Sequence, residues 1–292
     1  MSRQFTHKLR IAPLFFVLAA LLLASTIKSV ALAQELGTLP YVPTPQVVVD
    51  EMLKMAEVKA NDFVIDLGSG DGRIIITAAK ALKARGLGVD IDTKLVDLSN
   101  KNAKSAGVSD RAEFAERDMF KTDISKASVL TLYVLPEFMQ KLRSKVQKEL
   151  KPGSRVVAHD YHMGDWYPDR MTTLTVPEKM EANGTDKAHI YLWIVPATVQ
   201  GTWNVEFEPA GKVDPLIFAF NQNYQMISAA AVGPGQPKIA DSKLAGDEVS
   251  FTLTMRSTPY QFTGKVAGNK LEGKALAAGA KEAILWRATK AP

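Results

Sequence analysis

An acidic residue followed by three alternating glycines is the segment of this chain best suited to chemistry: Asp66, Gly68, Gly70 and Gly72. Glycines allow a backbone to approach a ligand closely, because no side chain pushes the ligand away. Arg73 stands where the dinucleotide-binding pattern G-x-G-x-x-G needs its third glycine, and the G-K-[ST] of a phosphate-binding P-loop is absent. The segment therefore predicts a ligand-binding turn that differs from both.

Further acidic positions extend this pattern. Asp90 lies 18 residues beyond Gly72, where an aspartate can accept hydrogen bonds from both hydroxyls of a ribose. Asp92 is the alternative, although its position is better suited to capping the next helix. Asp118 and Met119 follow the third predicted strand, where an adenine would be met. A glycine turn or a single aspartate is often purely structural, but the three elements in this order favour a nucleoside-containing cofactor.

Strand-like and helix-like segments alternate from about residue 40 to residue 196. We expect parallel strands at 63–67, 87–91, 112–116, 128–135 and 155–159, and a terminal antiparallel pair at 172–176 and 189–195. We expect helices that start at Thr44-Pro45 with Thr44 as N-cap, that end at Gly86 and near Gly107, and that carry an apolar stripe from Phe138 to Leu150. This alternation predicts an α/β domain, residues 34–197, with a doubly wound sheet that binds ligands at the carboxyl ends of its strands.

The pattern changes after Pro196. Apolar and polar residues alternate over 249–255 and 260–266, and Gly268-Asn269 suits a two-residue hairpin turn. We expect residues 198–292 to form a smaller, antiparallel all-β domain, either a barrel or a sandwich. Its aromatic residues are expected to form a core rather than a ligand site: Trp203, Phe218, Phe251 and Phe262.

The 292 residues carry a formal charge of +5 and no cysteine. Residues 1–33 hold four basic residues and no acid, with an apolar run at 11–27 before Ala31-Leu32-Ala33. We expect a signal peptide cleaved near Ala33 and an exported, periplasmic or secreted protein; a membrane anchor at 11–27 is the alternative. Without these residues, the net charge of residues 34–292 is +1, which argues against a nucleic-acid partner. The lack of cysteine excludes disulfides, thiolate catalysis and cysteine-bound metals.

Three stretches carry a resemblance to a known family: PYVPTP (40–45), VIDLGSGDGRI (64–74) and KELKPGSRVVAHDY (148–161). The glycine segment is similar to the D-x-G-x-G-x-G of class I S-adenosylmethionine (AdoMet) methyltransferases. Together the stretches resemble archaeal and mitochondrial protein-lysine methyltransferases over about residues 40–166. The resemblance implies a Rossmann-like sheet, AdoMet as cofactor and N-methylation of a protein lysine. It also implies cofactor contacts from Tyr41, Thr44, Asp66, Gly68, Ser69, Gly70, Gly72, Asp90, Asp118 and Met119.

The methyl acceptor is expected at the carboxyl ends of the fourth and fifth predicted strands. The candidates there are Tyr133, Leu135, Pro136, His159 and Asp160. Because AdoMet already carries a good leaving group, a general base is not obligatory, and the sequence names no catalytic residue. The N-P-P-Y signature of amide-nitrogen and adenine methyltransferases is absent. His159 and Asp160 can also be read as a strand end and a polar loop, and no metal site is expected.

Two other functions stay open from the sequence. One is methylation of a small molecule, and the other is an exported protein that binds AdoMet or a nucleoside without catalysis. The expected partner is accordingly a protein lysine or a small-molecule acceptor. A membrane is expected to contact the chain only through an uncleaved N-terminal segment.

Overall fold

The computed structural model describes residues 41–209 and 215–292. The predicted signal peptide, its cleavage site and the alternative membrane anchor lie outside the described residues. The chain divides into a unit that ends at Pro43 and a second unit, Thr44–Pro292, which contains two β-sheets. Among the described residues, no helix is both long and apolar enough to cross a membrane.

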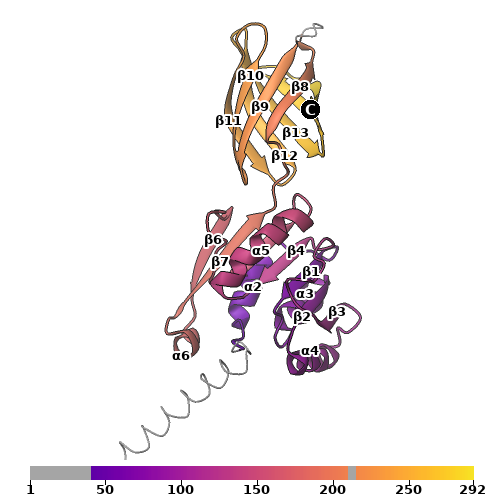
Figure 1. Cartoon of the computed structure of the whole chain (residues 1–292), viewed down its shortest axis with the longest axis vertical. Helices are drawn as coiled ribbons and strands as arrows, with labels where there is room; N and C mark the ends of the chain where they lie inside the picture. The colour runs from indigo at the N-terminus through magenta and orange to yellow at the C-terminus, as the bar shows by residue number, and fades with distance from the viewer. Residues whose placement is uncertain (1–40, 210–214) are drawn as a thin grey trace, which may run out of the picture. The chain divides into compact units, whose positions relative to one another are not determined.

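The first sheet has seven strands in the order β3-β2-β1-β4-β5-β7-β6 (Figure 1). Its strands are β1 (Phe63–Leu67), β2 (Arg85–Asp90), β3 (Ala112–Glu116), β4 (Val129–Leu132), β5 (Arg155–His159), β6 (Arg170–Thr175) and β7 (Lys187–Ile194). The first five are parallel, whereas β7 is antiparallel to both β5 and β6. The predicted, mostly parallel sheet is therefore confirmed. Because the strand order reverses between β1 and β4, their carboxyl ends form the edge at which such sheets bind ligands.

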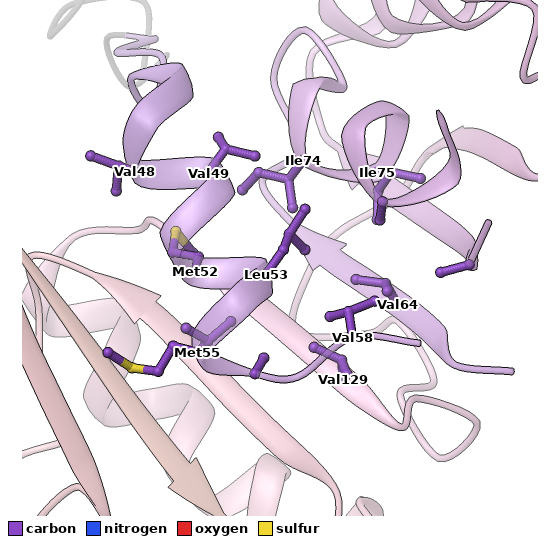
Figure 2. Close-up of a cluster of buried hydrophobic side chains, with 14 of the residues drawn as sticks. Val48, Val49, Met52, Leu53, Met55, Val58, Val64, Ile74, Ile75 and Val129 are labelled. Carbon is purple, nitrogen blue, oxygen red and sulfur yellow. The ribbon is translucent and has the colours of Figure 1, made fainter. Parts of the chain in front are cut away.

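Helices cover both faces of this sheet. They are α2 (Gln46–Met55), α3 (Arg73–Leu82), α4 (Thr93–Ala106), α5 (Pro136–Glu149) and the short α6 (Lys179–Asn183). Successive residues of a strand point to opposite faces, so Val64 packs with α2 and α3 while Ile65 packs in the cluster that includes α5. Figure 2 shows the first cluster, in which Val49 and Leu53 of α2 lie near Ile74. The strands whose carboxyl ends form the ligand-binding edge, β1 and β4, are thus buried on both faces.

The predicted start of α2 is wrong in its capping residue. Pro45 occupies the N-cap position, and no side chain caps the helix. The backbone carbonyl of Thr44 instead accepts a hydrogen bond of 2.7 Å from Nη1 of Arg73. Thr44 is therefore held by a residue of the glycine segment, which local helix rules do not reveal.

The predicted role of Gly86 is also wrong. The helix α3 ends at Leu82, and Lys83 takes the left-handed conformation (φ 62°) after it. Gly86 lies within β2, where a Cβ would come 2.7 Å from the carbonyl oxygen of Val64. Close strand packing therefore explains this glycine. The helix end at Gly107 (φ 69°) is confirmed, as is the interpretation of Asp92, whose side chain caps α4 by accepting from the backbone amide of Lys94.

The second sheet has eight antiparallel strands in the order β10-β9-β8-β15-β14-β13-β12-β11. They are β8 (Gly201–Phe207), β9 (Leu216–Asn223), β10 (Met226–Val232), β11 (Lys238–Ala245), β12 (Glu248–Met255), β13 (Thr258–Ala267), β14 (Lys270–Ala277) and β15 (Ile284–Lys290). Consecutive strands are neighbours and β15 pairs with β8, so the sheet curls into a nearly closed barrel. The expected all-β domain is confirmed, and Gly268-Asn269 forms the predicted hairpin turn between β13 and β14.

Aromatic side chains fill the interior of this barrel. Phe251 and Phe262 stack with ring centroids 5.0 Å apart, and Trp286 lies 5.1 Å from Phe262. Phe218 meets Phe251 edge to face at 5.1 Å. All four are buried, and aromatic pairs of this geometry add to the free energy gained by burial. They form the packed core expected from the sequence.

Candidate functional site

The glycine segment forms a tight turn between β1 and α3. Gly68, Gly70 and Gly72 all have positive φ angles of 81°, 55° and 82°. The amides of Gly68 and Ser69 both donate to the carbonyl of Val89, at 2.8 and 2.9 Å. The turn after β1 is therefore tied to the end of β2, and glycines are required because L side chains rarely adopt this backbone conformation.

Gly72 has a second reason to lack a side chain. A Cβ built on it would lie 2.6 Å from Cζ of Phe114 and 2.7 Å from Cβ of Ser99. Such distances are shorter than real contacts, so the turn, α4 and β3 can only approach this closely around a glycine. The third glycine of the pattern thus serves packing beneath the turn.

Asp90, at the end of β2, faces the same turn. Its Oδ2 accepts a hydrogen bond from the amide of Gly70 at 2.9 Å, and its Oδ1 accepts from the amide of Asp92 at 3.1 Å. Each carboxylate oxygen can accept more than one hydrogen bond. The two backbone amides therefore orient the carboxylate and leave acceptor capacity for a pair of hydroxyls.

Asp66, at the carboxyl end of β1, is buried in this edge. Its Oδ1 accepts a hydrogen bond of 2.6 Å from the hydroxyl of Thr131 on β4. Burial raises the pKa of Asp66 to about 7; the Thr131 hydrogen bond opposes this shift, and the nearby charges of Asp90 and Asp71 add to it. Three carboxylates therefore crowd one edge of the sheet, an arrangement suited to a cationic ligand.

Arg73 links the turn to the chain before α2. Its Nε and Nη2 donate to the two carboxylate oxygens of Asp71 at 2.9 and 2.6 Å, while Nη1 reaches the carbonyl of Thr44. Asn102 of α4 donates to the backbone carbonyl of Asp71 at 2.9 Å. Arg73 was considered in the sequence only as a missing glycine. The bidentate ion pair between Arg73 and Asp71 stabilises the turn.

The other predicted cofactor residues have different settings. Asp118 follows β3, and its carboxylate accepts from the amide of Phe120 at 2.8 Å. The amide of Arg117 donates to the carbonyl of Asp90, which joins this loop to the end of β2. Met119 is partly buried against the apolar cluster around α5. Tyr41 belongs to the unit that ends at Pro43, and its side chain is largely exposed.

Three of the five acceptor candidates come together. The rings of Tyr133 and His159 lie 4.0 Å apart, and Asp160 follows His159 in the left-handed conformation (φ 62°). Leu135 and Pro136 instead begin α5, Leu135 as its N-cap and Pro136 as its first residue. A Cβ on Gly68 would lie 3.4 Å from Cγ1 of Val134, so the segment after β4 borders the glycine turn.

We call the sheet edge that carries Tyr133, His159 and Asp160 the acceptor edge. Burial strongly shifts the pKa values of two of its side chains. Burial lowers the pKa of His159 to about 4, so its imidazole is neutral at pH 7. Burial also raises the pKa of Tyr133 to about 12, although a hydrogen bond from Asn183 opposes this shift. Neither side chain is therefore ready to accept or release a proton near neutrality. In the part of the chain that the structure describes, no cluster of potential metal ligands exists.

The structure adds two acceptor-edge residues that the sequence did not indicate. Lys179 and Asn183, both of α6, contact Asp160 and Tyr133 respectively. Trp166, which follows β5, is fully buried and stacks on Tyr224. Tyr133 also stacks on Tyr161, with ring centroids 6.3 Å apart, so this edge combines polar side chains with three neighbouring rings.

Comparisons with known proteins identify the family. The family described as the ANTKMT methyltransferase domain matches residues 66–170. A protein-lysine N-methyltransferase of Saccharolobus islandicus is 40% identical over 157 residues, which cover 53% of this chain and 93% of that protein. The chain belongs to this methyltransferase family. It is also 30% identical to an adenine nucleotide translocase lysine N-methyltransferase of Mus musculus over 129 residues, 44% of this chain and 56% of that protein.

A solved structure gives a further similarity to this methyltransferase. A Salinibacter ruber RNA methyltransferase in complex with S-adenosyl-L-homocysteine is 48% identical, with a TM-score of 0.49. The similar region covers 54% of this chain and 96% of that one. The eight-stranded barrel falls outside the family match at residues 66–170.

The methyltransferase uses AdoMet, and its turn after β1 fits that cofactor. Ser69 Oγ is buried and has no hydrogen-bond partner among the described residues. The positive-φ glycines add no side chains to the turn, and Asp90 presents an oriented carboxylate. These residues would hold the ribose and the adjoining chain of AdoMet, while Asp66 contributes negative charge. The AdoMet-binding interpretation of the glycine segment therefore agrees with the observed geometry.

Proposed function

We propose that this methyltransferase transfers the methyl group of AdoMet to lysine side chains of proteins. The main support is the 40% identity to a protein-lysine N-methyltransferase across 93% of that relative's length. The absence of the N-P-P-Y signature after β4, where Tyr133 stands, agrees with an acceptor other than an amide or adenine nitrogen.

AdoMet supplies an activated methyl group on a positively charged sulfur. The chain must hold a neutral amine in line with that methyl group, because an ammonium has no lone pair. A lysine ammonium must therefore lose a proton to solvent first. The lone pair of the amine would then form the nitrogen–carbon bond while the carbon–sulfur electron pair passes to sulfur, which leaves a methylated ammonium. Tyr133 and His159 would contribute by excluding water, since desolvation lowers the pKa of an amine.

The test is transfer of a labelled methyl group by the full chain to a protein extract, to total RNA and to the small-molecule fraction of the same cells. We expect label in protein, and methylated lysine after digestion and mass spectrometry. The Asp90→Ala chain is the control for cofactor-dependent labelling. Label confined to RNA or to small molecules would contradict the lysine assignment and leave the methyltransferase assignment intact.

We also propose that the chain is exported. The support is the sequence of residues 1–33, with four basic residues, no acid and an apolar run before Ala31-Leu32-Ala33. Expression of the full chain in a bacterial host should give a product that begins at Gln34 and fractionates outside the cytoplasm. An N-terminus at Met1 in the membrane fraction would instead favour the anchor.

A further inference from the structure

Lys179 of α6 is buried within the acceptor edge. Its side chain is 2% exposed, and Nζ forms an ion pair with Oδ2 of Asp160. The same Nζ lies 3.2 Å from Nε2 of His159. Buried lysines are rare unless they are paired. The short helix α6 therefore places an alkylammonium group among residues that follow β5.

Asp160 is held in a conformation that suits this contact. Its φ angle of 62° is in the left-handed region, which aspartate occupies at a cost in free energy. The residue is fixed there by His189, whose amide donates to Oδ1 at 3.0 Å and whose carbonyl accepts from the Asp160 amide at 2.7 Å. With Oδ1 committed to the backbone, Oδ2 is the oxygen presented to an amine.

His159 is the second partner of the amine, and Tyr133 packs on His159. The ammonium of Lys179 can only donate, so Nε2 of His159 accepts and the ring proton resides on Nδ1. That Nδ1 is buried and has no hydrogen-bond partner among the described residues. The Tyr133 ring packs against the imidazole, with the ring centroids 4.0 Å apart. The site therefore combines a carboxylate, an imidazole acceptor and an aromatic ring, which is the chemistry that recognises a lysine side chain.

The attachment of α6 depends on the same site. Met180, Glu181, Ala182 and Asn183 are exposed, so Lys179 is the buried residue of the helix. The second side-chain contact described for α6 is the hydrogen bond from Asn183 Nδ2 to the Tyr133 hydroxyl at 3.2 Å. The side-chain hydrogen bonds described for α6 are therefore all made to the acceptor edge. A ligand that takes these contacts would release the helix.

We propose that Asp160, His159 and Tyr133 form the binding site for the acceptor lysine, and that Lys179 occupies it as an internal substitute for the substrate. The helix α6 is then a cap that must move before a substrate lysine enters. This inference rests on the proposed lysine acceptor. The proximity of Val134 to Gly68 places the site next to the cofactor turn, as methyl transfer requires.

The first test is the Lys179→Met variant of the full chain, because methionine fills a similar volume without a charge. An internal competitor lowers the apparent affinity by the fraction of molecules whose site is open. We expect the KM for a lysine-containing protein to fall about tenfold, with the AdoMet dissociation constant unchanged. Lys187→Met, at an exposed lysine near Asp186, is the matched control and should leave KM unchanged. An unchanged or higher KM in Lys179→Met would overturn the proposal.

The second test measures amine binding without methyl transfer, using n-butylammonium chloride and thermal unfolding. Lys179→Ala vacates the site, which should then bind the added alkylammonium, so the Tm of this variant should rise by several degrees above a sodium chloride control of equal ionic strength. The wild-type chain and the double variant Asp160→Asn/Lys179→Ala should show no such rise. Equal responses in all three chains would refute the site. Because this assay needs no acceptor protein, it can succeed where lysine methylation fails, and the reverse also holds.

Discussion

Asp66 offers a sharp test of the cofactor edge, because the structure gives it opposite effects on stability and on ligand binding. An ordinary aspartate has a pKa of 3.8, whereas burial raises the pKa of Asp66 to about 7. Replacement by asparagine keeps the shape of the side chain and its acceptor oxygen for the Thr131 hydroxyl, and removes the buried charge. We therefore expect Asp66→Asn to stabilise the cofactor-free protein at alkaline pH while weakening AdoMet binding.

The direction of the stability change follows from the protons that the folded and the unfolded protein bind. Between about pH 4 and pH 7 the folded protein keeps the Asp66 proton that the unfolded chain has lost, so wild-type stability falls as pH rises through this range. Above pH 7 both states are ionised and the full cost remains. At 1.36 kcal/mol per pKa unit this cost is about 4 kcal/mol. The new amide needs a partner of its own, at about 1–3 kcal/mol, so we expect a net gain of about 1–3 kcal/mol at pH 8.

Urea unfolding from pH 4 to pH 8 measures this difference, and calorimetry with AdoMet measures binding. Asp92→Asn is the control, since asparagine also caps helices and Asp92 caps α4 from the surface of the same edge. The difference between Asp66→Asn and wild type should grow with pH and should exceed the Asp92→Asn difference at pH 8. A pH-independent difference for Asp66→Asn would refute the buried-charge reasoning, and unchanged AdoMet affinity would remove Asp66 from the cofactor site.

Three other outcomes are expected. Gly72→Ala should lower the free energy of unfolding by about 3 kcal/mol, because it adds a collision with Phe114 to backbone strain. Gly107 has open space around it, so Gly107→Ala should lower this free energy by only about 1 kcal/mol. Thermal denaturation compares the two variants. The lowered pKa of His159 should make the protein lose up to about 3 kcal/mol of stability as pH falls from 6.5 to 4. The reason is that only the unfolded chain takes up a proton on this histidine in that pH range. His159→Gln should therefore make the free energy of unfolding less dependent on pH between 6.5 and 4. Asp90→Ala should weaken AdoMet about 100-fold in calorimetry, because charge-assisted hydrogen bonds to two hydroxyls are lost, and an unchanged affinity would exclude the ribose role.

Local pattern was sufficient for most of the first sheet. The strand at 63–67 and the glycine turn depend on apolar runs and on backbone freedom, which neighbouring residues express directly. The sequence predicts a helix end at Gly86 because a glycine after a helical stripe usually ends the helix. Its actual reason is the approach of β2 to Val64 of β1, a contact between residues 22 positions apart. The fourth strand is shorter than predicted, Val129–Leu132, because its apolar residues continue into the loop that borders the glycine turn.

Lys179 shows why part of the site could not be predicted. It lies in the segment PEKMEANG, which reads as an exposed, charged turn, and its partner Asp160 lies 19 residues earlier. Asn183 and its contact to Tyr133 span 50 residues. Neither spacing is that of a local motif, since the pairs meet only when β7 inserts between β5 and β6 and leaves α6 at the acceptor edge.

The sequence by itself determined the parts that depend on local chemistry: the order of strands and helices, the glycine turn with Asp90, and the alternating core of the barrel. Tertiary structure alone decided the protonation of Asp66, the bracing of Thr44 by Arg73, and the burial of Lys179 against Asp160. The physical reason is that a pKa or a buried ion pair depends on every group that packs around it, and those groups come from distant strands. A turn or an amphipathic strand depends mainly on its own residues.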